Sequence, residues 1–109
     1  MIAWERVKEL RAEIGNDDFA EVAVMFLEEA DEAVARLLPG LSAKAMEADL
    51  HFLKGAALNL GFDALSGLCQ EGERRAASGD TSVDLESVRN AYFASKAAFE
   101  AGMDQAFAA

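Results

Sequence analysis

Apolar residues recur along this chain at intervals of three and four, and this spacing predicts helices. No segment shows the two-residue alternation of a half-buried strand. Five segments have helical spacing, at about residues 3–14, 16–38, 42–60, 62–79 and 85–106. The apolar stripes expected in the core include Phe26 in the second segment, Leu68 in the fourth and Ala106 in the last. Short loops between long amphipathic helices favour antiparallel neighbours. The expected fold class is therefore all-α, an antiparallel up-down four-helix bundle with an additional short N-terminal helix.

Turn and capping residues stand at the expected helix ends. Gly15 is expected to end the first helix in a left-handed conformation, and Asn16 to cap the second. Gly61 permits a tight reversal between the third and fourth helices. Thr81 followed by Asp84 resembles a capping box for the last helix, with the shorter acid in place of glutamate.

Length and composition indicate one acidic globular domain over residues 1–109, with 52% apolar residues and a net charge of −10. The charge argues against nucleic acid and against an anionic membrane surface as partners. No apolar run approaches the roughly 20 residues of a membrane span, and the N-terminus lacks a signal pattern. A soluble cytoplasmic protein is expected. The single cysteine, Cys69, cannot form an internal disulfide and is expected to be buried, whereas the acids between Glu28 and Glu32 are expected to form a solvated face.

The candidate chemistry centres on His51, the only histidine in the chain. Lys54 and Gly55 follow it by three and four residues, so the three share one helix face. Imidazole can act as a nucleophile near neutral pH. Glycine inside a helix costs about 1 kcal/mol relative to alanine, so its presence needs a reason. The pattern indicates a nucleophilic nitrogen kept open, with a cation beside it for an anion.

A nucleophilic ring nitrogen requires the proton on the other nitrogen, and Glu73 is the candidate acceptor for that proton. Gly61 lies 10 residues after His51, and Glu73 lies 12 residues after Gly61, so a reversal at Gly61 brings the two side chains level. An error of one residue rotates a helix by about 100°, which leaves Gln70 and Glu71 as alternative neighbours.

Two residues near His51 have open interpretations. Gly55 either gives access to the ring or allows close helix packing, the role expected of Gly67 and Gly72. Asn59 either bonds near the turn or faces solvent.

The segment around His51 resembles the signature of the histidine phosphotransfer (HPt) domain, a family of small helical bundles in bacterial and plant phosphorelays. The resemblance rests on His51-x-Leu53-Lys54-Gly55-Ala56-Ala57, Leu60-Gly61, Leu65, Leu68-Cys69 and Glu73, and it extends to residues 16–19 and 26–28. It implies that His51 is the phosphoacceptor and that Glu73, at a position usually Gln or Glu, orients the imidazole. Lys54 would screen the charge of the phosphoryl oxygens.

The resemblance implies that other proteins supply the phosphoryl group and the metal ion. The chain has no glycine-rich phosphate loop, and one histidine with one cysteine cannot make a four-ligand metal site. We therefore expect a phosphocarrier without ATP-dependent activity, cofactor or metal of its own, acting as a monomer. The resemblance implies response-regulator receiver domains as partners, with Mg²⁺ on the receiver; a hybrid histidine kinase is a further candidate. Leu58 and the exposed flank of the second helix are expected near the docking surface.

Two alternatives remain from other classes of protein. Kinase dimerisation domains usually have an acid directly after the histidine and a proline a few residues later, whereas here Phe52 follows and the one proline is Pro39. A non-catalytic helical interaction module would not need His51, Lys54 and Gly55 together.

Overall fold

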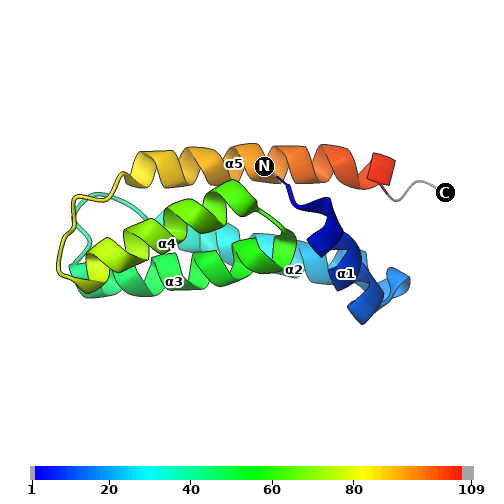
Figure 1. Cartoon of the computed structure of the whole chain (residues 1–109), viewed down its shortest axis with the longest axis horizontal. Helices are drawn as coiled ribbons and strands as arrows, with labels where there is room; N and C mark the ends of the chain where they lie inside the picture. Colours follow the sequence, from blue (N-terminus) through cyan, green and yellow to red (C-terminus); the bar gives the residue numbers. More distant parts are fainter. Residues whose placement is uncertain (1, 107–109) are drawn as a thin grey trace.

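The computed structural model describes residues 2–106 and has five helices in that range. They are α1 (Trp4–Ile14), α2 (Asn16–Arg36), α3 (Ala43–Leu60), α4 (Asp63–Ala77) and α5 (Leu85–Ala106). The described residues contain no named strand, only an isolated bridge between Ile2 and Phe62. Helices α2 to α5 run along the long axis of an elongated molecule, and α1 lies across one end (Figure 1). The all-helical prediction is confirmed, with α2 and α4 each ending two residues before the predicted boundary.

Two of the predicted caps are wrong. Asn16 is the first residue of α2 and makes no capping bond, because α1 and α2 are joined by Gly15 alone. Gly15 has the expected positive φ of 100°, but its ψ of 148° lies outside the left-handed helical region. At the start of α5, Asp84 accepts a hydrogen bond from the Ser87 amide at 3.0 Å and replaces Thr81 as the cap.

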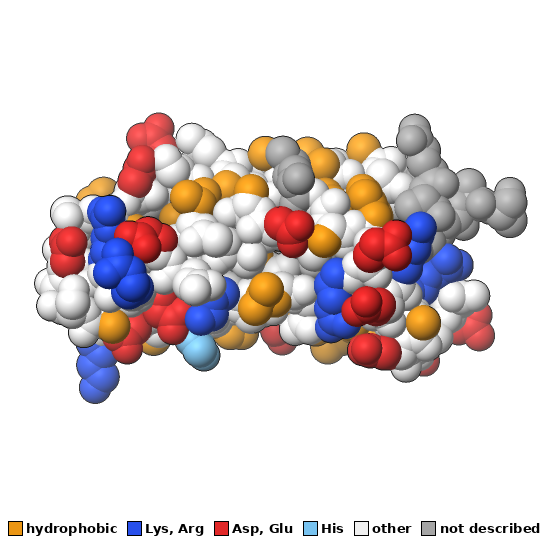
Figure 2. All heavy atoms as spheres, in the orientation of Figure 1, with side chains coloured by type: hydrophobic (Ala, Val, Ile, Leu, Met, Phe, Trp, Pro, Cys, Tyr) orange, Lys and Arg blue, Asp and Glu red, His pale blue; other side chains and the backbone are white. Residues whose placement is uncertain are grey.

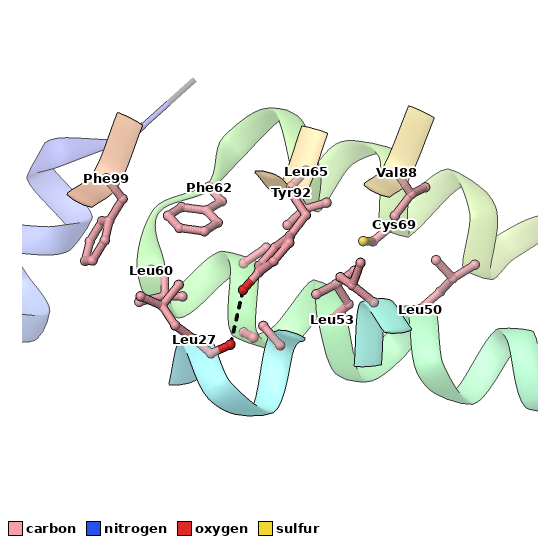
Figure 3. Packing of buried hydrophobic residues seen from close by; sticks show 14 of the residues in the cluster. Leu27, Leu50, Leu53, Leu60, Phe62, Leu65, Cys69, Val88, Tyr92 and Phe99 are labelled. Carbon is pink, nitrogen blue, oxygen red and sulfur yellow. Dashed lines mark hydrogen bonds between the residues drawn. The ribbon is translucent and has the colours of Figure 1, made fainter. Parts of the chain in front are cut away.

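The core draws on all five helices and includes most residues of the predicted apolar stripes, but Leu68 of α4 is 39% exposed. Cys69 is fully buried, as expected, and burial raises the pKa of its thiol to about 12. Phe26, which was assigned to the buried stripe of α2, is only partly buried. Figure 3 shows Tyr92 reaching across the core to donate a hydrogen bond to the Leu27 carbonyl at 3.1 Å. The side chain of Ala106, also assigned to the core, lies outside the described residues.

The acidic run on α2 is not wholly a solvated face, because Asp31 is a structural acceptor. It accepts from the Tyr92 hydroxyl, and the Lys96 ammonium lies 3.0 Å from its carboxylate. Burial and the Asp31 carboxylate raise the pKa of Tyr92. The sequence did not reveal this role, because Asp31 differs from exposed Glu28 and Glu32 only in lying opposite Tyr92 and Lys96 of α5.

The reversal between α3 and α4 determines which residues face each other across these helices. Gly61 adopts φ 76° and ψ 24°, the left-handed conformation that glycine accepts readily. The Ala3 amide donates to the Gly61 carbonyl at 2.6 Å, so the N-terminal segment braces the turn. Gly72 packs closely, as expected, since a Cβ there would lie 2.9 Å from Leu50 Cδ1. The same expectation for Gly67 is wrong, because that glycine is exposed with open space around its Cα.

The surface carries many acidic groups with basic ones among them. Figure 2 shows both kinds on one face, and the pale blue histidine stands out at its lower edge. None of the helices within residues 2–106 is long and apolar enough to cross a membrane.

Candidate functional site

The site is built on the midpoint of α3, where His51 projects from the surface. Its side chain is 69% exposed, and Nδ1 lies 2.7 Å from Glu73 Oε1 on α4. This hydrogen bond engages one ring nitrogen. Among the described residues no hydrogen bond engages the other nitrogen, Nε2, which is therefore available to an incoming group.

Glu73 is the hydrogen-bond partner of His51 Nδ1. The Lys54 ammonium, together with the hydrogen bond from His51, lowers the pKa of Glu73 against the opposing effect of burial. The carboxylate is consequently ionised near neutral pH and can only accept a hydrogen bond. In the neutral form of the ring, His51 then carries its proton on Nδ1, which leaves the lone pair on Nε2.

The count of residues across Gly61 therefore predicts the neighbour of His51 correctly. The alternative Glu71 lies elsewhere, since its carboxylate bonds to Arg74 at 2.6 Å and to Arg75 at 3.1 Å. Gln70 is exposed on α4. The similar numbers of residues on the two sides of Gly61, 10 and 12, place Glu73 opposite His51 because α3 and α4 pack closely along their length.

Lys54 makes a contact that the sequence did not predict. Its Nζ atom is 2.8 Å from Glu73 Oε2, and its side chain is only 24% exposed. The ammonium is thus held in an ion pair with the carboxylate that also holds His51. The i, i+3 spacing places Lys54 near the ring, but it gives no information about an acid on another helix.

The surface beside His51 is open. A Cβ placed on Gly55 would meet nothing within 4 Å, so the close-packing interpretation of this glycine is wrong. A cavity of about 310 Å³ lies between α2 and α3 at this point. Its lining residues are Phe26, Glu29, His51, Phe52, Gly55, Ala56 and Asn59. Leu58, expected near this surface, is 55% exposed.

Two features of this region were not predicted from the sequence. Phe26 and Glu29 of α2 line the cavity, although the sequence pattern assigns one to the core and the other to solvent. Arg6 of α1 donates from Nη2 to Asn59 Oδ1 at 3.2 Å, which answers the open question about Asn59. No local signal could have found this bond, because 53 residues separate its partners.

The described part of the chain holds no group of three or more His, Cys, Asp or Glu side chains that could bind a metal ion.

Comparison with known proteins gives one match. The family model of the Hpt domain matches residues 21–109. No curated protein and no solved structure matches the chain.

Proposed function

This chain belongs to the Hpt domain family, and we propose that it relays a phosphoryl group between receiver-domain aspartates through His51. Hpt domains are histidine phosphotransfer modules of two-component phosphorelays. The observation that supports His51 most directly is its hydrogen bond to Glu73, which engages Nδ1 and leaves an exposed Nε2 free.

The proposed transfer begins with the neutral ring. The Nε2 lone pair attacks the phosphorus atom of an aspartyl phosphate on the docked receiver. A P–N bond forms as the P–O bond to the aspartate breaks, and the aspartate leaves as a carboxylate. No proton has to leave, because the Nδ1 proton stays in its bond to Glu73. The ring becomes cationic, and the Glu73 carboxylate stabilises this charge.

Lys54 has a proposed role that depends on its position at Glu73. Its ammonium is 2.8 Å from Oε2 in the unphosphorylated chain. A phosphoryl group on Nε2 would bring new negative charge to the same face of α3, where Lys54 can screen it. In this proposal the Lys54 ammonium interacts with both the Glu73 carboxylate and the phosphoryl oxygens.

Access to His51 is the second requirement for transfer. The cavity of about 310 Å³ beside the ring and the open space at Gly55 leave room for a receiver. Exposed Phe52 and Leu58 offer apolar contacts on the same helix. We propose that this surface and the adjoining flank of α2 form the docking site.

The remaining parts of the proposal concern the chain as a whole. Residues 1–109 form one domain in which α2 to α5 are an antiparallel up-down four-helix bundle, an arrangement supported by their alignment along one axis in Figure 1. The chain acts as a cytoplasmic monomer, a phosphocarrier without its own ATP-dependent activity or cofactor. The receiver supplies Mg²⁺, and a hybrid histidine kinase is a candidate source of the phosphoryl group.

The decisive experiment is label transfer from receivers phosphorylated with ³²P to the wild-type chain and to His51→Gln. We expect acid-labile, base-stable label on the wild type and none on the variant, with unchanged helical content by circular dichroism. Wild type that accepts label from no receiver of its source organism would contradict the proposal. Label that persists on His51→Gln would place the acceptor elsewhere.

A further inference from the structure

Asn59 lies on the face of α3 that carries His51, at the far end of the cavity. It follows His51 by eight residues and Gly55 by four, and it lines the cavity with both. Eight residues correspond to about 12 Å along a helix axis. Asn59 is thus too far from Nε2 to touch a transferring phosphoryl group, but a docked protein would reach it.

The size of a protein interface supports contact with Asn59. A small transient interface covers about 600 Å² on each partner, which is a patch of about 14 Å radius. A receiver that reaches His51 along the cavity covers Asn59, because the cavity extends between them. Gly55 lies between them and has no side chain that would block the cavity.

Arg6 orients the Asn59 side chain. A guanidinium can only donate hydrogen bonds, so the amide atom that faces Arg6 Nη2 at 3.2 Å must be the carbonyl oxygen. The amide NH₂ group is therefore turned away from α1. Glu9 and Glu13 lie 3.3 and 3.7 Å from Arg6 Nη1 and hold the guanidinium from its other side.

This arrangement comes from a part of the chain that the family match does not include. The match begins at residue 21, inside α2, whereas Arg6 belongs to α1. Arg6 thus lies outside the matched region, whereas Asn59 lies within it.

We propose that Asn59 is a specificity-determining residue for the receiver and that Arg6 is its positioning residue. The Asn59 amide donates a hydrogen bond to an acceptor on the docked receiver, either a backbone carbonyl or a carboxylate. The inference rests on the proposed function, since it requires a receiver docked at His51. It favours receivers with an acceptor at this contact over those with a buried donor or a cation there.

The test measures transfer from the phosphorylated chain to a receiver as a function of receiver concentration. Asn59→Asp keeps an acceptor for Arg6 but removes the NH₂ donor and adds a negative charge. We expect it to raise the half-saturating receiver concentration about ten-fold, and Asn59→Ala about three- to five-fold, as the loss of one hydrogen bond implies. The maximal transfer rate should remain that of the wild type, because the phosphoryl group lies about 12 Å away.

Arg6 variants separate positioning from general stability. Arg6→Met keeps the apolar stem and should raise the half-saturating concentration about three-fold, whereas Arg6→Lys, which can still donate, should restore it. Arg89→Met is the matched control, because Arg89 of α5 also donates between segments, to the Leu37 carbonyl at 2.6 Å, but lies outside the cavity. This control should leave the half-saturating concentration unchanged.

Direct phosphorylation by phosphoramidate, a small donor that needs no docking, checks the site in every variant. Equal labelling of His51 in all of them, together with the expected shifts, supports the inference. The inference is overturned if Asn59→Asp and Asn59→Ala have the half-saturating receiver concentration of the wild type. It is also overturned if phosphoramidate labels these variants less than the wild type, because that result indicates damage to the site. If the wild type is labelled by phosphoramidate but transfers to no receiver, the proposed function fails and the inference fails with it.

Discussion

Gly55 and Gly72 both lie inside helices, α3 and α4, but their surroundings differ. A Cβ on Gly72 would lie 2.9 Å from Leu50 Cδ1 and 3.0 Å from Val83 Cγ1. A Cβ on Gly55 would meet nothing within 4 Å. Each glycine costs its helix about 1 kcal/mol relative to alanine. At Gly72 closer packing within the chain offsets this cost, whereas at Gly55 nothing within the chain does.

This difference separates a closely packed region from an accessible one. The α3–α4 contact at Gly72 is closed, and it holds Glu73 within hydrogen-bond distance of His51. The surface at Gly55 is open and gives access to the same ring. The open glycine has no close packing contact to offset its cost, which agrees with the receiver docking proposed for this surface.

The largest effect is expected when glutamine replaces the closed glycine. Gly72→Gln would force a long polar side chain against fully buried Leu50 and should lower the free energy of unfolding by about 3 kcal/mol. Urea denaturation measures this change. A loss below about 1 kcal/mol would show that the α3–α4 contact can open, and the comparison between the two glycines would fail.

The same substitution at the open glycine should affect transfer and leave folding intact. Gly55→Gln puts a long side chain at i+4 from His51, where it should obstruct a docking receiver and slow transfer about ten-fold. Its free energy of unfolding should rise by up to about 1 kcal/mol.

Gly55→Ala serves as the control for that variant. It should show the same gain in stability with a smaller loss of transfer rate, because its methyl group is short. An unchanged transfer rate in Gly55→Gln would mean that the open surface is not a docking surface.

Removal of the Glu73 carboxylate should slow the phosphorylation of His51 but leave the ring accessible. Glu73→Ala should slow phosphorylation of His51 about three- to ten-fold, because the ring loses its acceptor at Nδ1 and the charge that stabilises the cationic product. The ¹⁵N chemical shifts of the single histidine should show the proton on Nδ1 in the wild type and a mixture of tautomers in the variant. Identical shifts in both proteins would remove Glu73 from the site.

The smallest effect concerns the pH dependence of stability. The folded-state pKa of Glu73 lies below its ordinary value of 4.5 because of Lys54 and His51. A carboxyl group with a lowered pKa stabilises the fold above the ordinary value, and this contribution is lost as pH falls through the folded value. Wild type should therefore exceed Glu73→Gln in stability by less than about 1 kcal/mol at pH 7, with the difference shrinking below about pH 4. Urea denaturation of both proteins across this range checks it, and a constant difference would contradict the assignment.

Much of the fold follows from local patterns, because a helix depends on neighbours three and four residues away. The apolar spacing predicts the five helices, and the count across Gly61 predicts that Glu73 faces His51. The predicted caps were wrong for local reasons. The cap at Asn16 is displaced by one residue because Gly15 alone joins α1 and α2. The cap at Thr81 is displaced by three residues because Asp84 stands directly before α5 and takes that role.

The sequence by itself determined the helices and the register of His51, Lys54 and Gly55, since all three share one element and its periodicity sets their common face. Only the tertiary structure decided which glycine is closed and which is open, because that depends on Leu50 and Val83 from other segments. It likewise decided that Lys54 pairs with Glu73 and that Arg6 holds Asn59. These contacts join residues far apart in the chain, and the packing of whole helices brings them together.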